Sequence, residues 1–343
     1  MISSLKDLGW SPFFARQTDA IPDGTPFRIT TVHRDRLTAL GQSGKTTLTT
    51  DAQRPTGEFT VGDWVLADDT GCILELLERQ TLIQRRAAGT DARIQLVAAN
   101  VDVLFIVSSC NNDFNIPRLE RYLALSYEAG CFPVIILTKA DLSEDSRDLV
   151  RQAEQLDPAV PVLCVDARDA GDLSLVAGWC PSGKTGAFVG SSGVGKTTLT
   201  NGLSGQHAAT GPMRQDDAKG RHVTTSRTLV GMKNGGWIID TPGMRALQLL
   251  DVQDGIDRLF NDITQLAMTC KFSDCQHDTE PGCAVTGAVA QGTLDPARMA
   301  RWDKLRREDR HNSESVAQSH ARGRAFGRMV RKAVKDKKMR KKR

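Results

Sequence analysis

The chain has 343 residues, 40% of them hydrophobic, so it can bury substantial cores, and we expect two or three domains. It has no apolar run of 18 residues, no basic region followed by an apolar core at its start, and only eight cysteines. These features exclude a membrane-spanning helix, argue against secretion and indicate a reducing, cytoplasmic compartment. The net charge of +4 is uneven, because residues 331–343 hold nine Lys/Arg and one Asp, a net +8, and the remaining residues sum to −4.

The N-terminal part predicts an arm followed by a small β-domain. Residues 1–26 form the arm. Residues 27–95 alternate in the manner of short strands, which we expect at 28–33, 58–61, 63–67 and 72–77. Four or five short strands favour a β-barrel, with an OB-type fold as the first choice and any other small β-domain as the alternative.

From residue 96 to residue 256 the pattern changes to long apolar runs separated by amphipathic helices. We expect strands at 101–107, 132–137, 160–165, 186–189 and 237–240, with helices at 117–129 and 146–156. Strands and helices that alternate in this way predict an α/β domain, with a parallel sheet covered on both faces.

The run Gly190–Thr197 in this domain fits G-x-x-x-x-G-K-[ST], the phosphate-binding loop. Its glycines let backbone N–H groups approach phosphate oxygens, and the helix that follows adds its positive N-terminal dipole. Lys196 is expected to reach the β- and γ-phosphates, and the Thr197 hydroxyl to bind Mg²⁺. The residues expected to bind the phosphates are Gly190, Ser191, Ser192, Gly193, Val194, Gly195, Lys196, Thr197 and Thr198.

Two similar runs lack this context. Gly178–Thr185 fits the same sequence pattern, but it contains Pro181, which removes a backbone donor. A strand is also expected after it, where a phosphate loop needs a helix. Gly41–Thr46 lacks the first glycine at the right distance and lies in the alternating β region. Only Gly190–Thr197 combines strand, loop and helix, and a glycine-rich turn with a surface lysine is the alternative.

Thr138-Lys-Ala-Asp141 ends another apolar strand, at the edge where ligands of open α/β sheets bind. It differs by one residue from Asn-Lys-x-Asp, the guanine-reading motif of GTPases. Asp141 is expected to accept from N1–H and the N2 amine of guanine, which adenine does not match, a difference of ~10⁴-fold or more. The Lys139 stem would pack over the base. Thr138 lacks the amide of the usual Asn, and an ordinary strand-end turn is the alternative.

Two further segments predict the switch regions of a GTPase. Asp240-Thr-Pro-Gly243 fits D-x-x-G, in which Asp240 binds Mg²⁺ through water and the Gly243 N–H senses the γ-phosphate. Within Lys219–Thr225, Thr224 is the first choice to complete the Mg²⁺ shell and Thr225 the second. The base motif precedes the phosphate loop and both switches, which predicts a circular permutation. The second switch would then lead directly into the C-terminal region.

Met244 stands where many GTPases carry a water-orienting Gln. Methionine cannot orient water, so we expect a low basal rate unless another group or a partner supplies this function. His222, in the first switch, is the nearest candidate for a catalytic role beside that of Lys196. A loop histidine with a structural hydrogen bond is the alternative.

The C-terminal part, residues 257–330, is predicted to be helical with one metal-binding insert. Cys270, Cys275, His277 and Cys283 have the spacing C-x₄-C-x-H-x₅-C. Three thiolates and one imidazole make a closed tetrahedral site, so we expect one structural Zn²⁺ worth ~10 kcal/mol or more of local folding energy. Three free thiols are the alternative.

Residues 331–343 form a basic tail without aromatic residues. This composition favours contact with phosphates over stacking on bases, and a solvated tail is the alternative.

These segments, in this order, resemble those of the RsgA (YjeQ) family of circularly permuted GTPases that depend on the small ribosomal subunit. The likeness extends over residues 27–300 and rests on Thr138–Asp141, Gly190–Thr197, Gly220–Thr225, Asp240–Gly243 and Cys270–Val285. Thr138 and Val223 depart from the family pattern, and Asp166-Ala167 stands where a Ser-Ala-like base loop is expected.

The resemblance implies an N-terminal OB fold that contacts ribosomal RNA, a central GTPase domain and a zinc-containing C-terminal domain. It also implies a role in late maturation of the small ribosomal subunit, with GTP hydrolysis stimulated by that subunit. We therefore expect a monomeric, cytoplasmic enzyme that binds GTP or GDP with Mg²⁺, has the subunit and its rRNA as partners and does not bind membranes. Nucleotide state would pass from Thr224 and Gly243 to the zinc domain.

Two other functions stay open at this point. An RNA-binding assembly protein with a purely structural nucleotide site would bind nucleotide tightly without turnover. Asp141 argues against a P-loop kinase or ATPase, and competition between GTP and ATP would separate that function from a GTPase.

Overall fold

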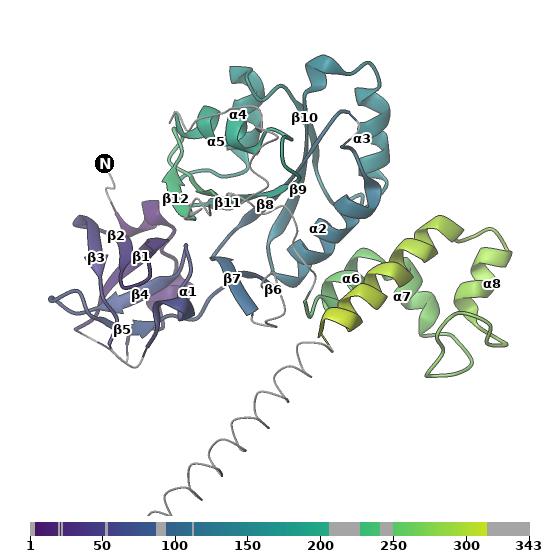
Figure 1. The fold of residues 1–343 in the computed structure, drawn as a ribbon, viewed down its shortest axis with the longest axis horizontal. Helices are drawn as coiled ribbons and strands as arrows, with labels where there is room; N and C mark the ends of the chain where they lie inside the picture. The colour runs from purple at the N-terminus through teal and green to yellow at the C-terminus, as the bar shows by residue number, and fades with distance from the viewer. Residues whose placement is uncertain are drawn as a thin grey trace, which may run out of the picture.

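The computed structural model of the chain describes residues 4–313 apart from 20, 22, 52–53, 87–93, 112, 206–226 and 241–249. Figure 1 shows a small sheet near the N-terminus, a central α/β unit and a group of helices on the C-terminal side. The N-terminal arm contains two short helical turns, η1 (Leu5–Leu8) and α1 (Pro12–Ala15). Leu8 and Phe14 are buried against Trp64 of the small sheet, so the arm packs on the β-domain.

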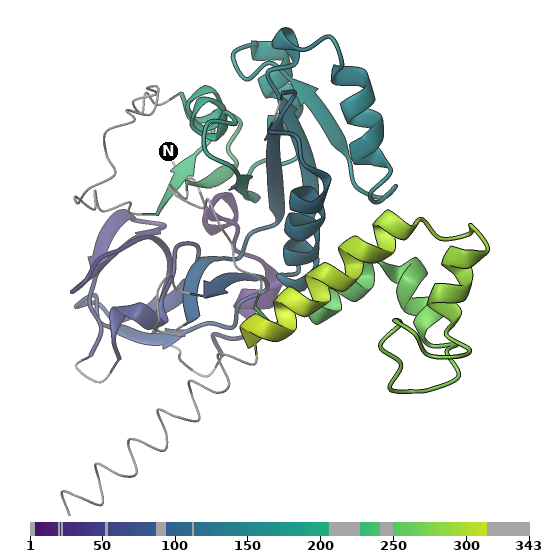
Figure 2. The same ribbon diagram turned by 45° about the vertical axis from the view of Figure 1, so that its right-hand side comes forward.

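The small sheet is antiparallel and has the strand order β3-β2-β1-β4-β5. Its strands are β1 (Thr25–Val32), β2 (Leu37–Gly41), β3 (Gly44–Leu48), β4 (Trp64–Ala67) and β5 (Ile73–Leu76). The two ends of the sheet meet at a parallel bridge between Thr49 and Cys72, so the sheet curls on itself, as Figure 2 shows. Alternate residues of the strands, among them Ile29 and Leu37, fill the interior.

The expected strand at 58–61 is wrong. Thr56–Glu58 forms the short 3₁₀ helix η2, and no strand follows it before β4. Phe59, Thr60 and Val61 are buried in succession, which differs from the alternation of a half-exposed strand. Strands β2 and β3 were not foreseen, because their threonine-rich hairpin carries few apolar residues.

A separate two-stranded sheet, β6 (Leu82–Arg86) with β7 (Ile94–Ala99), links the small sheet to the α/β unit. The boundary expected between residues 95 and 96 therefore lies inside β7. The boundary expected between residues 256 and 257 lies inside the helix α6 (Gln253–Leu259).

The central sheet has six strands in the order β10-β9-β8-β11-β13-β12. They are β8 (Val103–Ser109), β9 (Phe132–Thr138), β10 (Val162–Val165), β11 (Thr185–Gly190), β12 (Thr228–Gly231) and β13 (Trp237–Asp240). All neighbours are parallel except β12 and β13. The base-motif strand β9 precedes β11 in sequence, yet only β8 separates the two in the sheet. The carboxyl ends of β8, β9, β11 and β13 therefore meet at one edge.

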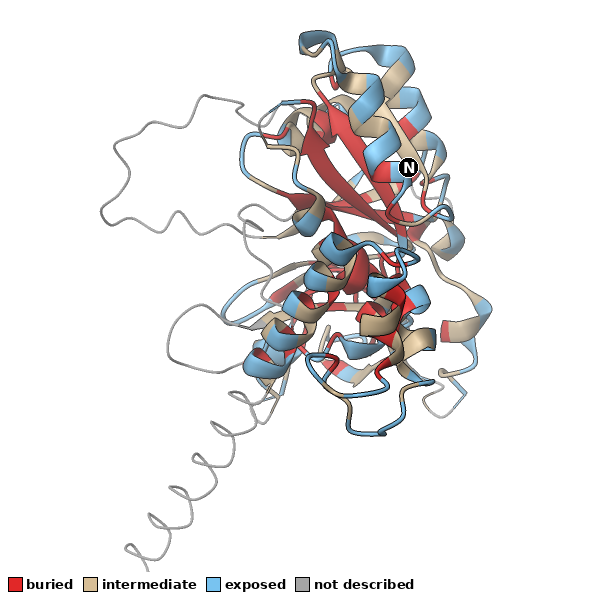
Figure 3. Cartoon of the chain, turned by 90° about the vertical axis from the view of Figure 1, so that its right-hand side faces the viewer, coloured by how far each residue is buried: buried red, intermediate tan, exposed pale blue. Residues whose placement is uncertain are grey.

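Helices cover both faces of this sheet. The helices α2 (Ile116–Glu128) and α3 (Ser146–Glu154) pack on one face, and α4 (Ala170–Gly178) and α5 (Lys196–Ser204) on the other. Figure 3 shows the buried strands between helices whose outer faces are exposed. Helix α4 was not foreseen because it contains Gly171 and Gly178, which are poor helix formers, and strand β12 was not foreseen either.

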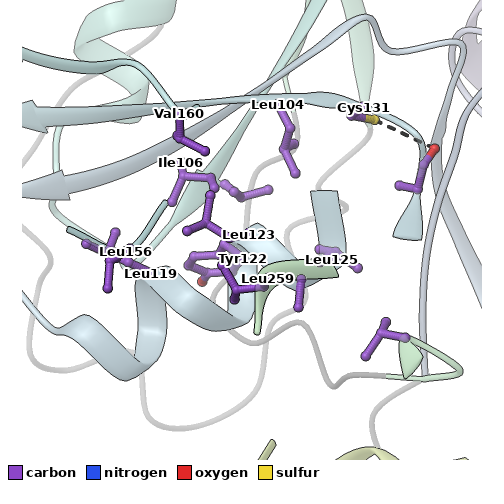
Figure 4. Packing of buried hydrophobic residues seen from close by; sticks show 14 of the residues in the cluster. Leu104, Ile106, Leu119, Tyr122, Leu123, Leu125, Cys131, Leu156, Val160 and Leu259 are labelled. Atoms are coloured by element: carbon purple, nitrogen blue, oxygen red, sulfur yellow. Dashed lines mark hydrogen bonds between the residues drawn. The ribbon is translucent and has the colours of Figure 1, made fainter. Parts of the chain in front are cut away.

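The C-terminal helices continue the core on the α2 side. They are α6, α7 (Asn261–Ala267), α8 (Ala284–Ala290) and the helical residues 296–313. Leu259, Phe260 and Trp302 belong to the same buried cluster as Leu104 and Leu123. Figure 4 shows Leu259 beside Tyr122 and Leu123 of α2. Helix α2 is therefore apolar toward both the sheet and the C-terminal helices.

Candidate functional site

The predicted phosphate loop lies where β11 ends and α5 begins. Gly190 has a φ of +144°, and a Cβ at this position would lie 2.1 Å from the Val107 carbonyl oxygen of β8. Gly195 caps α5 with a φ of +99°. These two positions need glycine, and together they fix the path of the loop. By contrast, the similar run 178–185 leads from the last residue of α4 into β11.

The Lys196 ammonium lies against the loop itself. It donates to the Gly190 carbonyl at 2.8 Å and also to the Ser191 carbonyl. Val194 is buried, whereas Ser192, Gly193 and Thr197 are exposed. Thr198 is half-buried. The exposed part of the loop and the first residues of α5 are thus open to a ligand, with a cation beside them.

Asp240 ends β13, the strand next to β11. Burial raises the pKa of its carboxyl group, and the charge of Lys196 acts in the opposite direction. The Asp240 carboxylate and the Lys196 ammonium are therefore close enough to interact electrostatically. The other residues expected to contact Mg²⁺, the γ-phosphate or the attacking water lie outside the described residues: Thr224, Gly243 and His222.

Thr138, the last residue of β9, connects the base motif to the phosphate loop. Its side chain is fully buried. Its hydroxyl donates to the Val194 carbonyl at 2.6 Å and lies 3.2 Å from the Ser108 carbonyl of β8. Thr138 lacks the amide of the usual Asn, as we noted from the sequence. Its hydroxyl instead forms a hydrogen bond directly with the phosphate loop.

The two charged residues of the base motif follow immediately. Lys139 has a left-handed backbone with a φ of 60° and precedes the short helix η3 (Ala140–Leu142), which holds Asp141. Asp141 is exposed. Asp166 follows β10 at the same edge, where its N–H donates to the Asp172 carboxylate at 2.7 Å. The base motif and the phosphate loop thus lie at the same edge of the sheet, at the ends of two strands that β8 separates.

One residue beside the loop was not foreseen. Arg118, in the first turn of α2, donates through Nη1 to the Ser191 hydroxyl at 2.5 Å and to Asp113 Oδ1 at 2.7 Å. Ser191 is 73 positions away in the sequence. No local pattern distinguishes Arg118 from Arg121, the other arginine of α2, so only the fold identifies it.

The four residues Cys270, Cys275, His277 and Cys283 come together, with their ligand atoms within 4.8 Å of one another. His277 Nδ1 lies 3.5 Å from the sulfur atoms of both Cys270 and Cys283, and these two sulfurs are 3.9 Å apart. Burial acts to raise the pKa of Cys283, but hydrogen bonds from Thr286 and His277 outweigh it and lower that pKa to about 6. This favours the thiolate of Cys283, the form that binds metals, whereas burial and the neighbouring thiols raise the pKa of Cys275 to about 11.

Comparison with known proteins places the chain among GTPases. The family model of the RsgA GTPase matches residues 76–250. The small ribosomal subunit biogenesis GTPase RsgA of Mesorhizobium japonicum is 52% identical over 326 residues, which cover 93% of each chain. RsgA 2 of Vibrio parahaemolyticus is 45% identical over 339 residues, 98% of this chain and 94% of the relative.

Two solved structures share the fold. YjeQ from Thermotoga maritima superposes with a TM-score of 0.60 at 24% identity and covers 82% of this chain and 97% of its own. YloQ, described as a circularly permuted GTPase, gives a TM-score of 0.57 at 23% identity, with 87% and 96% covered. The circular permutation predicted from the motif order is therefore confirmed.

Within the described residues, no helix is both long enough and apolar enough to cross a bilayer. The extent and identity of the matches, together with the order of the strands, decide the family. The chain belongs to the RsgA family of GTPases.

Proposed function

We propose that this GTPase acts in biogenesis of the small ribosomal subunit, as a late maturation factor whose hydrolysis of GTP the subunit stimulates. The observation that carries the proposal is the junction of phosphate loop and base motif, which the Thr138–Val194 hydrogen bond ties together. Relatives that match more than nine-tenths of the chain are named small ribosomal subunit biogenesis GTPases.

The phosphate site would be built from residues 190–198. Backbone N–H groups of this loop and the N-terminus of α5 would bind the phosphates, and Lys196 would add a point charge. Thr197 and Asp240 would hold Mg²⁺, with Thr224 as a further ligand. The ion would neutralise charge on the phosphate oxygens. A hard cation prefers such oxygen ligands, and the exposed Thr197 at the start of α5 fits that requirement.

The base would be read at the end of β9, at the same edge of the sheet. Asp141 would accept from guanine, and the Lys139 stem would pack on the ring. Thr138 would hold this motif against the loop rather than touch the base, because its hydroxyl is already bonded to the Val194 carbonyl. Gly243 and His222 keep their proposed roles as γ-phosphate sensor and candidate catalytic residue.

The Cys/His cluster would hold one structural Zn²⁺. A tetrahedral ion with Zn–S of about 2.3 Å and Zn–N of about 2.0 Å separates two sulfurs by about 3.8 Å and sulfur from nitrogen by about 3.5 Å. The observed separations of 3.9 Å and 3.5 Å match these values. All four positions of such an ion would be filled by protein, which supports a structural rather than a catalytic role.

The flanking parts would contact RNA. The strand order β3-β2-β1-β4-β5 and the Thr49–Cys72 bridge support an OB-type barrel in the N-terminal β-domain, beside the arm. The basic residues 331–343, which follow the GTPase and zinc domains, would bind phosphates. We propose a cytoplasmic monomer that meets the subunit and its rRNA through these parts.

Phosphate release from GTP and from ATP, each with and without purified small subunits, tests the proposal. We expect slow turnover of GTP alone, strong acceleration by the subunit and no comparable turnover of ATP. Equal turnover of ATP would contradict the reading of guanine by Asp141. A rate that does not respond to the subunit would contradict the proposed role in ribosome biogenesis.

A further inference from the structure

Arg118 lies between the turn that contains Asp113 and the phosphate loop. Its Nη1 lies 2.7 Å from Asp113 Oδ1, 3.2 Å from the Asp113 carbonyl and 2.5 Å from the Ser191 hydroxyl. Because Nη1 carries two hydrogens in the guanidinium plane, its contacts with Asp113 and with Ser191 restrict the orientation of the group. Its side chain is 36% exposed, so it borders the open side of the site.

The turn that carries Asp113 is itself fixed. The Asp113 N–H donates to Asn111 Oδ1 at 3.0 Å, and the Ser109 hydroxyl donates to the same oxygen at 2.8 Å. Ser109 is the last residue of β8, the strand between the base-motif strand and β11. Arg118 is therefore anchored to the sheet edge through Asp113 and not only to its own helix.

Two cations thus hold the same short stretch of the loop. Lys196 bonds the backbone carbonyls of Gly190 and Ser191, and Arg118 bonds the Ser191 side chain. Because Lys196 belongs to α5 and Arg118 to α2, the start of the loop is held from both faces of the sheet. A loop that must present its N–H groups to phosphate gains from such bracing, since a displacement of about 1 Å can cost ~100-fold in rate.

We propose that Arg118 is a positioning residue for GTP hydrolysis that acts through Ser191 and keeps the phosphate loop in its productive geometry. This inference rests on the proposed phosphate-binding role of the loop. The positively charged Arg118 side chain thus comes from helix α2 of the same chain and acts on the phosphate loop. The enzyme has Met244 where many GTPases carry Gln.

The test compares Arg118→Met, which keeps the apolar stem, with Arg118→Lys, which keeps the charge, in the full-length protein. For each variant, kcat and KM for GTP, the Kd for GDP and the melting temperature are measured. We expect Arg118→Met to lower kcat by about 10- to 100-fold with KM and Kd changed by less than about threefold. Arg118→Lys should recover at least part of the lost rate.

Arg121→Ala is the matched control. Arg121 lies on the same helix and is ion-paired to Glu308, with no bond to the loop. Its kcat should match wild type. An equal fall in kcat for Arg121→Ala, or a wild-type kcat for Arg118→Met, would overturn the proposal. So would a loss that only follows a lower melting temperature.

Ser191→Ala, alone and combined with Arg118→Met, tests whether Arg118 acts through the Ser191 side chain. If Arg118 acts through Ser191, the double variant should be no slower than the slower single variant. Losses that multiply, or a harmless Ser191→Ala, would overturn the route through Ser191. Lys196→Ala tests the site itself, because retained GTP binding in that variant would contradict the phosphate site and not the role of Arg118.

Discussion

The two flanking parts of the molecule join the central sheet by different kinds of contact. The C-terminal helices share one apolar cluster with the α2 face of the sheet, which includes Leu123 and Phe260. Most buried residues of the β-domain and the arm instead form clusters of their own, and the apolar links to the central sheet are fewer: Val61 belongs to the central cluster and Trp237 packs against the arm cluster. The C-terminal helices should therefore fold with the GTPase sheet as one unit, whereas the β-domain should behave as an attached body.

Polar contacts also cross the junction of the β-domain. The buried guanidinium of Arg28 donates to the Leu8 carbonyl at 2.5 Å, the Asn100 carbonyl at 3.2 Å and the Thr185 hydroxyl at 2.8 Å. Burial lowers the pKa of Arg28 to about 10, while Asp102 and Asp63 act in the opposite direction. The Arg28 side chain thus connects the arm, the residue that follows β7 and the start of β11 by hydrogen bonds.

Buried charge supplements the apolar contact on the C-terminal side. Glu120 of α2 is fully buried, and the Nε–H of Arg301 lies 2.9 Å from each of its two carboxylate oxygens. Arg121 pairs with Glu308 on the same C-terminal helix. Since Arg118 begins the same α2 helix at the phosphate loop, α2 contacts both the predicted nucleotide site and the C-terminal helix.

Metal removal should give the largest difference between the two flanks. Chelation of Zn²⁺, or Cys283→Ser, should remove ~10 kcal/mol of local folding energy and expose the C-terminal helices, while the β-domain keeps its amide protection. Hydrogen exchange followed by mass spectrometry measures both regions at once. Cys72→Ser, a half-buried thiol in the β-domain, is the control. Unchanged exchange after chelation would contradict the structural role of the metal.

Arg301→Ala should have the next largest effect, because it leaves the Glu120 carboxylate buried without its partner. We expect a loss of about 3–5 kcal/mol in the free energy of unfolding, measured with urea. Arg307→Ala removes an exposed pair with Asp303 on the same helix and should cost under about 1 kcal/mol. Equal losses in the two variants would contradict the comparison.

The same variant should show a characteristic pH dependence. Burial raises the pKa of Glu120 above its ordinary value of 4.5, although Arg301 opposes this. Without Arg301 the folded state should bind the Glu120 proton more strongly than the unfolded state does. The stability deficit of Arg301→Ala should therefore shrink as the pH falls toward 4.5 and grow as it rises. Urea titrations across this range test the sign, and a constant deficit would contradict it.

Arg28→Met should have a smaller effect, confined to the junction of the β-domain. The substitution leaves three acceptors without their donor but also removes a costly buried charge, so we expect a loss of about 1–3 kcal/mol. Faster amide exchange in η1 and β1, with unchanged exchange in α6, is the expected result. Arg36→Met, at an exposed pair with Asp35, serves as the control. Faster exchange across the C-terminal helices would show that the β-domain is not a separate body.

Trp237→Phe should have the smallest effect. It removes the 2.6 Å hydrogen bond from the indole N–H to the Asp7 carbonyl while keeping an aromatic ring. We expect a loss of about 1 kcal/mol, with the added exchange limited to the arm. An unchanged exchange rate in η1 would mean that this bond does not hold the arm.

The sequence predicted the α/β unit well because its signals are local. Apolar runs mark β8 and β9, and the two glycines at 190 and 195 meet conformational demands of the loop itself. The β2–β3 hairpin was missed because its apolar content is low, and α4 was missed because it contains two glycines. The Thr138–Val194 and Arg118–Ser191 bonds join segments 56 and 73 positions apart, so no local pattern could predict them.

We expect α2 to couple the nucleotide site to the C-terminal helices. Hydrogen exchange of the full-length protein, with a non-hydrolysable GTP analogue and with GDP, tests this coupling most directly. We predict that the two nucleotides differ in the protection of α2 and of residues 296–313, and not only of the phosphate loop. The β-domain strands should exchange alike in both states. A difference confined to the phosphate loop, or one that appears in the β-domain and not in the C-terminal helices, would contradict this account.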